Sequence, residues 1–140
     1  MTRIILDCSA AVALVLPDEK SAAVTQWLDG LPQDAEIAVP ALWWYESTNV
    51  LLTAVRRGVM SAAEAREALS ALRLLPRVTH EPPGPTTAAH LFHLGIGHTL
   101  TAYDAAYIAL AELSGGTLLT LDRRLAAVAA AMQLAVICLQ

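Results

Sequence analysis

The chain has 140 residues, of which 56% are hydrophobic and 16% are charged, and its formal net charge at pH 7 is -4. This length suits a single domain, residues 1–140, and the apolar composition excludes a disordered chain. The acidic balance excludes a protein that holds nucleic acid through a broad Lys/Arg surface.

Five short apolar runs bounded by turn residues predict strands. They are Arg3–Leu6, Glu36–Val39, Leu75–Thr79, Thr117–Leu121 and Ala135–Cys138. Helical patterns lie between them, at Ser9–Leu16, Ser21–Leu28, Ala41–Arg57, Ser61–Leu72, Thr86–Leu94, Thr101–Leu113 and Arg123–Met132. Because strands and helices alternate throughout, we expect right-handed crossovers and a parallel sheet with helices on both faces, the α/β class.

The longest apolar stretch, Leu125 to Leu139, is interrupted by Gln133 and is shorter than the roughly 18 residues that a membrane span requires. Arg3 is the only early basic residue and acids soon follow it, which is unlike an export signal. We therefore expect a cytoplasmic protein with no membrane partner. Cys8 and Cys138 lie in apolar segments, which favours reduced core thiols over a disulfide.

Four of the 13 acidic residues stand in surroundings that differ from an ordinary solvated surface. Asp7 ends the first predicted strand and Asp122 follows the fourth, and ligands of open α/β sheets bind at the carboxyl ends of strands. Glu46 lies in a helical segment rich in bulky apolar residues, and Asp104 lies near the start of another helix. These four residues are the candidate site.

Each acid has a simpler interpretation when it is considered alone. Asp7 or Ser9 is a candidate N-cap of the first helix, Asp122 is a candidate N-cap of the last, and the Thr101-x-x-Asp104 spacing matches a capping box. Glu46 begins a polar stripe that would be solvated on an amphipathic helix. The aromatic residues just before Glu46, Trp43 and Trp44, are predicted to pack in the core or at an interface.

Independent capping does not predict that two strand ends and two helices direct carboxylates toward one edge of a parallel sheet. Two bare carboxylates about 4 Å apart repel by about 4 kcal/mol at an effective dielectric constant of 20, so a cluster of four requires protons or a cation. All-oxygen ligands favour Mg²⁺ or Mn²⁺. Such a site can cleave a phosphodiester with a metal-activated water and no nucleophilic side chain.

Four segments, in this order, resemble the PIN-domain family along nearly the whole chain. They are Asp7–Ser9, Pro40–Asn49, Ala102–Tyr107 and Thr120–Leu125. Within that family the chain is similar to VapC-type toxins, which are single-domain ribonucleases neutralised by a small VapB-type antitoxin. The resemblance implies a metal-dependent endoribonuclease that acts on RNA.

The resemblance also implies a three-layer PIN-like fold, with a five-stranded parallel sheet in the order 3-2-1-4-5. It places all four acids in one Mg²⁺ or Mn²⁺ site. Ser9 and Thr120 match positions that support this site through hydroxyl hydrogen bonds, and Asn49 matches a polar neighbour of the glutamate. The family further implies a homodimer and an antitoxin tail that presents a basic side chain to the acids.

Several other polar residues have weaker signals. Arg123 and Arg124, beside the last acid, are candidates for contacts with RNA phosphates. His90 and His93 are spaced by three residues on a predicted helix, but no Cys or acid is near them in the sequence, so we expect ordinary helix residues rather than metal ligands.

Two other functions remain open. The first is a catalytically inactive PIN-like domain whose acidic groove binds a basic peptide. The second is a phosphoryl-transfer domain with Asp7 as the nucleophile. The details oppose the second, because Ser9 stands where a second aspartate is usual and the only lysine, Lys20, is far from any late strand.

Overall fold

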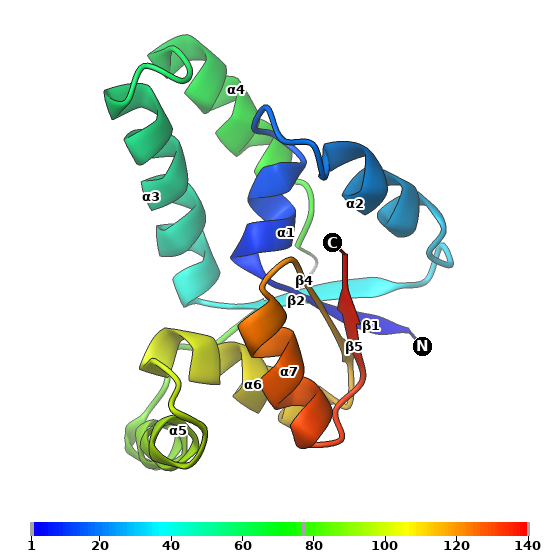
Figure 1. Ribbon diagram of the computed structural model, residues 1–140, viewed down its shortest axis with the longest axis vertical. Coiled ribbons are helices and arrows are strands. Elements are labelled where there is room, and N and C mark those ends of the chain that lie inside the picture. The colour runs from blue at the N-terminus through cyan, green and yellow to red at the C-terminus, as the bar shows by residue number, and fades with distance from the viewer. Residues whose placement is uncertain (1, 77, 140) are drawn as a thin grey trace.

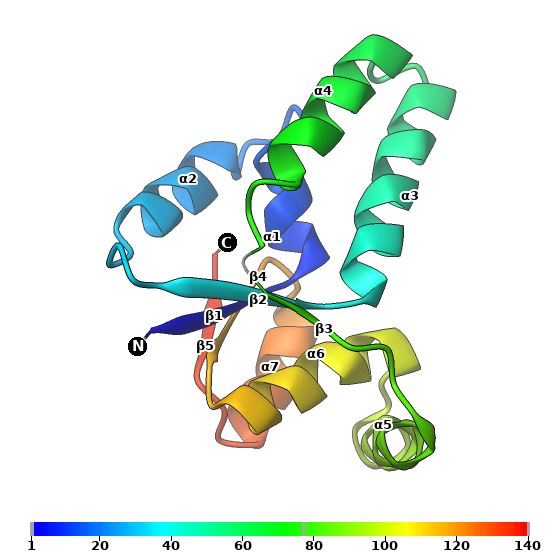
Figure 2. The ribbon, with the colours of Figure 1, turned by 180° about the vertical axis from the view of Figure 1, so that it is seen from behind.

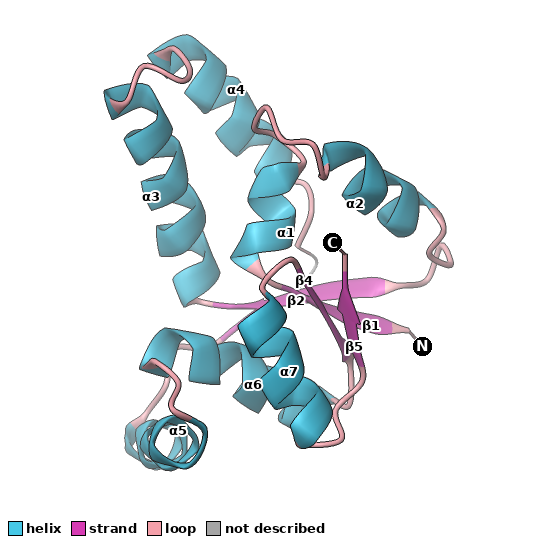
Figure 3. Ribbon diagram, in the orientation of Figure 1, coloured by secondary structure: helices cyan, strands magenta, loops and turns pink. Residues whose placement is uncertain are grey.

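Parallel strands form the middle layer of the computed structural model, which describes residues 2–76 and 78–139 (Figure 3). The strands are β1 (Arg3–Leu6), β2 (Glu36–Pro40), β3 (Val78–His80), β4 (Thr117–Thr120) and β5 (Val136–Cys138). Neighbours pair in parallel, in the order β3-β2-β1-β4-β5. The predicted α/β class and strand order are confirmed.

Helices cover both faces of this sheet (Figures 1 and 2). On one face lie α1 (Cys8–Ala13), α2 (Ser21–Asp29), α3 (Leu42–Arg56) and α4 (Ala62–Leu72). On the other lie α5 (Pro85–His98), α6 (Ala102–Ser114) and α7 (Arg123–Ala131). From β1 the chain adds strands in one direction as far as β3, and it then returns to add β4 and β5 on the other side of β1. Because each crossover has the same handedness, this change of direction places the later helices on the opposite face.

The reversal of strand order falls between β1 and β4, the position at which ligands bind in doubly wound sheets. Leu6 is paired with Leu119 there, and the Asp7 N–H donates to the Leu119 carbonyl at 3.0 Å. Asp7 and Thr120, the next residues along, therefore meet at the carboxyl ends of two neighbouring strands.

The central strands are apolar because helices cover both of their faces. Ile4, Ile5 and Leu6 of β1 and Leu118 and Leu119 of β4 are at most 1% exposed. Together with helix side chains they form the hydrophobic core. Packing in the core thus fixes the relative positions of the two strand ends, which carry Asp7 and Thr120.

The third strand differs from its prediction, which began at Leu75 and ended at Thr79. Leu75 belongs to the turn that follows α4, where its N–H donates to the Leu72 carbonyl at 3.1 Å, and Arg77 lies outside the described residues. β3 is an exposed edge strand, so burial on both faces is wrong for it. Its position is set by its pairing with β2 and by a hydrogen bond from Trp44 Nε1 on α3 to Thr79 Oγ1 at 3.1 Å, because its own residues are not buried.

The fifth helix is longer than the predicted Thr86–Leu94. It continues through Gly95 and ends at His98, and Thr99, the next residue, has a left-handed backbone with φ of 55°. The Leu100 N–H donates to the Gly95 carbonyl at 3.1 Å, and a Cβ on Gly95 would lie 3.0 Å from the Leu100 carbonyl oxygen. Gly95 therefore allows the chain to turn tightly into α6.

Three smaller expectations can be compared with the structure. Trp43 is fully buried and packs edge-on against Trp44, with ring centroids 4.9 Å apart, so its core role is confirmed. Cys8 and Cys138 do not form a disulfide, as expected. Over the described part of the chain, no helix has the length and apolar character needed to cross a bilayer.

The close approach of β1 and β4 gives a prediction at Gly116. An added Cβ there would lie 2.9 Å from the Arg3 carbonyl oxygen, so we expect Gly116→Ala to lower the free energy of unfolding by about 1–3 kcal/mol. The matched control is Gly97→Ala in α5, where nothing lies within 4 Å, and this change should instead stabilise by about 0.5–1 kcal/mol. Urea unfolding of both variants measures the difference, and equal effects would contradict the close packing at Gly116.

Candidate active site

Asp7 occupies the carboxyl end of β1 and is only 7% exposed. Its Oδ2 accepts hydrogen bonds from Ser9 Oγ at 2.6 Å and from Thr120 Oγ1 at 2.7 Å. Each hydroxyl also accepts a backbone N–H of the turn after β4, Ser9 from Leu121 and Thr120 from Asp122. The two hydroxyls therefore tie the β1–α1 turn to the β4–α7 turn through one carboxylate oxygen.

Asp7 stands at the N-cap position of α1, but its side chain makes no capping hydrogen bond to that helix, so capping does not account for the place of its carboxylate. Burial raises the pKa of Asp7 above its ordinary value, and the charge of Asp122 raises it further. The hydrogen bonds from Ser9 and Thr120 oppose this rise, because they stabilise the ionised form. Asp7 is thus a desolvated carboxylate held in one orientation.

Glu46 lies on α3, one turn after its start, and is partly buried. Its Oε1 accepts a hydrogen bond from the hydroxyl of Tyr107 on α6 at 2.6 Å. Burial raises the pKa of Glu46, the Tyr107 hydrogen bond lowers it, and the charges of Asp7 and Asp104 raise it. The interpretation of Glu46 as part of a solvated stripe does not fit this burial. Asn49, one turn further along α3, is exposed.

Asp104 lies in the first turn of α6. Its backbone N–H donates to Thr101 Oγ1 at 3.1 Å, so Thr101 caps this helix as the sequence indicated. Burial raises the pKa of the Asp104 carboxyl, and the charges of Asp122 and Asp7 add to the rise, whereas Arg124 lowers it. Its carboxylate therefore stands among the same charged groups as Asp7.

Asp122 caps α7, and this interpretation is confirmed, because its Oδ1 accepts from the backbone N–H groups of Arg124 and Leu125 at 2.9 and 3.2 Å. The cap does not remove its charge from the site, since that charge raises the pKa values of Asp7 and Asp104. Asp122 thus both begins a helix and contributes to the negative potential.

Arg123 and Arg124 are exposed in the first turn of α7. The Arg124 guanidinium donates through Nη2 to the Thr99 carbonyl at 2.5 Å. This contact ties α7 to the turn between α5 and α6. It also brings a positive charge to Asp104, whose pKa it lowers.

The four acids come from β1, α3, α6 and the turn before α7, and their carboxylates influence one another electrostatically. Within the described ranges, however, no three His, Cys, Asp or Glu side chains stand close enough to hold one metal ion together. The arrangement is a group of like-charged carboxylates, and burial raises the pKa values of three of them, Asp7, Glu46 and Asp104. Carboxylate oxygens are the type of group that suits hard cations such as Mg²⁺ or Mn²⁺.

Tyr107 is the residue of this region that sequence reasoning missed as a site residue. It is fully buried on α6 and follows Asp104 by three residues, so both side chains lie on one face of that helix. The spacing from Asp104 was the one signal in the sequence that could have indicated a role at the site. An aromatic residue on an apolar helix is, however, equally well explained as part of the core.

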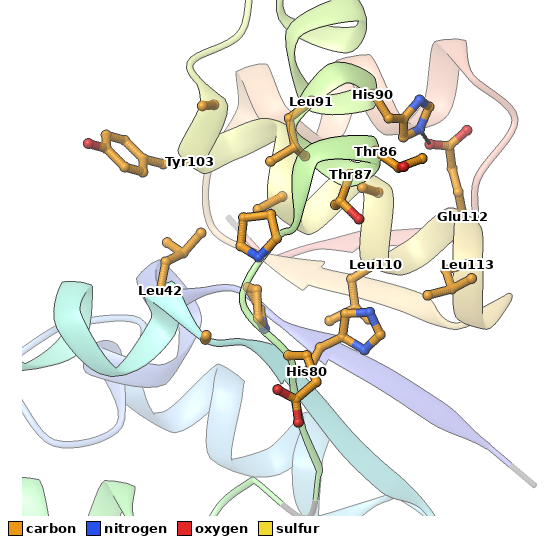
Figure 4. A pocket seen from close by; sticks show the side chains of 17 residues that line it. Leu42, His80, Thr86, Thr87, His90, Leu91, Tyr103, Leu110, Glu112 and Leu113 are labelled. Carbon is orange, nitrogen blue, oxygen red and sulfur yellow. Dashed lines mark hydrogen bonds and ion pairs between the residues drawn. The ribbon is translucent and has the colours of Figure 1, made fainter.

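An apolar cavity of about 550 Å³ lies beside α5 and α6, and none of the four acids lines it (Figure 4). Leu91, Leu110 and Leu113 contribute to its wall. His90 and Glu112 face each other across part of it, with Nε2 and Oε1 3.0 Å apart. The fold thus supplies an acid near His90 that the sequence did not reveal, but the described residues hold no three-ligand metal group there.

Comparisons with known proteins agree with this fold. The PIN-domain family model matches residues 4–131. Ribonuclease VapC3 from Pyrobaculum aerophilum is 36% identical over 124 residues, which cover 89% of this chain and 92% of that protein.

Solved structures with the same fold include a crystal structure of a protein from Pyrobaculum aerophilum, with a TM-score of 0.73 and 28% identity. The match covers 96% of this chain and 83% of the other. VapBC2 from Rickettsia felis, solved bound to a DNA fragment from its promoter, has a TM-score of 0.74 at 10% identity, over 99% of this chain and 100% of that one. The chain therefore belongs to the PIN-domain family, and along most of its length it is similar to a VapC ribonuclease.

Proposed function

We propose that this chain is a metal-dependent endoribonuclease, the toxin of a VapBC-type pair, which cleaves RNA by metal-activated water. The proposed catalytic and metal-binding residues are Asp7, Glu46, Asp104 and Asp122. The main support is that carboxylates from four separate elements gather where the strand order reverses, and that burial and mutual repulsion raise the pKa values of three of them. Ribonuclease VapC3, to which the chain is similar, supports the choice of RNA.

The chemistry of the acids suits a hard divalent cation, Mg²⁺ or Mn²⁺. Carboxylates that are desolvated and repel one another are unfavourable without a counter-charge, which such a cation supplies. Mg²⁺ is commonly held by only one or two carboxylates, with water and phosphate oxygens completing its shell, so the spread of these acids suits it. When bound, the cation supplies a hydroxide from water at neutral pH and neutralises charge on the scissile phosphate.

The residues around the acids have distinct proposed tasks. Ser9 and Thr120 hold Asp7 through its Oδ2, which fixes the direction of the remaining carboxylate oxygen. Asp104 lies at the N-terminal end of α6, where backbone N–H groups favour negative charge. Asn49, exposed one turn beyond Glu46, is a proposed polar contact at the rim of the site.

Arg123 and Arg124 are the proposed contacts for RNA phosphates. They are exposed at the positive end of α7, next to the acids. A chain with a net charge of -4 needs such local positive charge to draw RNA to a negative site.

The proposed partner is a small VapB-type antitoxin that places a basic side chain among the acids. A group of desolvated carboxylates would bind such a side chain in the same way as it binds a cation. We also propose a homodimer, for which the apolar side chains exposed on α5 and α6, among them Phe92, Ile96 and Leu113, offer a contact surface.

The first prediction concerns cleavage. Replacing one proposed ligand, Asp104→Asn, should slow RNA cleavage at least about 100-fold. Mutation of residues that only orient metal ligands already lowers metal affinity or activity by about 10–100-fold. The matched control is Asp34→Asn, the same change at an exposed position between α2 and β2, which should cleave like the wild type. Brief expression in cells followed by sequencing of new RNA 5′ ends measures cleavage and names the target.

Discrete new ends with the wild type and Asp34→Asn, but not with Asp104→Asn, would support the proposal. If the wild type and Asp104→Asn produce the same new RNA 5′ ends when comparable amounts of soluble protein are expressed, the catalytic role of Asp104 is refuted. Binding of a basic peptide by an inactive PIN-like domain would then be the leading function.

The second prediction concerns the chemistry of the products. A metal-activated water leaves a 5′-phosphate and does not need the RNA 2′-hydroxyl as a nucleophile. We therefore expect cleavage products that ligate directly through 5′-phosphate ends, and continued cleavage when the nucleotide at the cut has a 2′-deoxy sugar. Products ending in cyclic 2′,3′-phosphates would contradict the mechanism.

The third prediction concerns stability without metal. The folded-state pKa values of Asp7, Glu46 and Asp104 lie above their ordinary values, so the folded protein binds protons more tightly than the unfolded chain. Their contribution to stability is therefore greatest at low pH and is lost as pH rises from their ordinary values of about 4 through the raised ones. At pH 7 in chelator, Asp104→Asn should raise the melting temperature by a few degrees.

Differential scanning calorimetry with chelator, and then with Mn²⁺, tests this prediction. Mn²⁺ should raise the melting temperature of the wild type more than that of Asp104→Asn. The advantage in melting temperature that the variant has in chelator should therefore become smaller or be reversed. A variant less stable than the wild type in chelator would mean that the Asp104 carboxylate is stabilised by its neighbours rather than repelled by them.

A further inference from the structure

Tyr107 joins the two helices that approach the site from opposite faces of the sheet. Its hydroxyl, on α6, donates to Glu46 Oε1, on α3, at 2.6 Å, a length typical of hydrogen bonds to a charged oxygen. The side chain is fully buried, so its hydroxyl has no solvent partner to turn to. The contact connects residues 61 positions apart and thereby links α3 to α6 at the site.

The direction of this hydrogen bond is fixed. Burial and the nearby acids raise the pKa of the Tyr107 phenol, so it stays protonated and acts as the donor. Glu46 then has one oxygen committed to Tyr107. Because a carboxylate has two oxygens in one plane, holding one of them restricts the direction of the other.

We propose that Tyr107 is a positioning residue of this site, whose buried hydroxyl orients the Glu46 carboxylate for metal binding. The proposal rests on the proposed function and adds to it a residue that contacts no substrate. α6 then supplies two groups from one face, the Asp104 carboxylate and, three residues later, the hydroxyl that orients the acid on α3. Ser9 and Thr120 hold Asp7 in the same manner, with hydroxyls from other elements.

The rival interpretation is a tie between helices that only stabilises the fold. Tyr107→Phe separates the two, because it keeps the buried ring and removes only the hydroxyl. The matched control is Tyr103→Phe, the same change on the same helix at a side chain that is 65% exposed. Melting temperatures of both variants establish that the molecules compared are folded.

The first readout is Mn²⁺ affinity without RNA, measured from the free ion by electron paramagnetic resonance. If Tyr107 positions Glu46, Tyr107→Phe should weaken Mn²⁺ binding by about 10-fold or more, as loss of partners that orient metal ligands does. RNA cleavage should fall in kcat with little change in KM, while Tyr103→Phe should match the wild type. A tie that is only structural would lower the melting temperature and leave Mn²⁺ affinity and kcat unchanged.

A double-mutant cycle provides the second test. In a Glu46→Gln background, Tyr107→Phe should change Mn²⁺ affinity by less than about twofold, because the residue through which it acts is already altered. An equal loss in both backgrounds would overturn the proposal, since Tyr107 would then act independently of Glu46.

The outcomes also separate this inference from the proposed function. If the wild type binds Mn²⁺ and cleaves RNA while Tyr107→Phe does both equally well, only the positioning role is refuted. If the wild type neither binds Mn²⁺ nor cleaves RNA, the proposed function fails and the positioning role fails with it.

Discussion

The pairing of β1 with β4 is the constraint on which the candidate site depends. The strand order reverses between these two strands, so the helices that follow them leave toward opposite faces and do not cover the strand ends. Gly116 permits the close approach, because a side chain there would meet the backbone of β1. The register set by this pairing places Asp7 beside Thr120, and the remaining acids are arranged around that pair.

The site concentrates negative charge in partly buried positions and uses neutral donors to hold it. Hydroxyl groups donate to Asp7 and to Glu46, and backbone N–H groups donate to Asp122. Such donors stabilise ionised carboxylates without neutralising their charge, so the acids still repel one another. Under the proposed function, a bound cation would relieve this repulsion and thereby stabilise the fold.

The two faces of the molecule around the site differ in character. α3 and α4 extend away from the sheet as a helical pair, while α5 packs against α6 at the other side (Figures 1 and 2). α5 has no Asp, Glu, Lys or Arg and exposes Phe92 and Ile96. The cavity lies on that side, and none of the four candidate acids lines it, although Glu81 and Glu112 contribute to its wall.

The sequence by itself determined the order of strands and helices, the parallel class of the sheet and the four unusual acids, because hydrophobic period and charge in apolar surroundings are local properties. Only the tertiary structure decided that β3 begins at Val78, since an exposed edge strand is defined by its neighbour rather than by its own residues. Only the tertiary structure revealed the Tyr107–Glu46 hydrogen bond and the contact of Arg124 with Thr99. These contacts join residues far apart in the chain, and they arise from the way α3, α6 and α7 meet at one edge of the sheet, which no local pattern encodes.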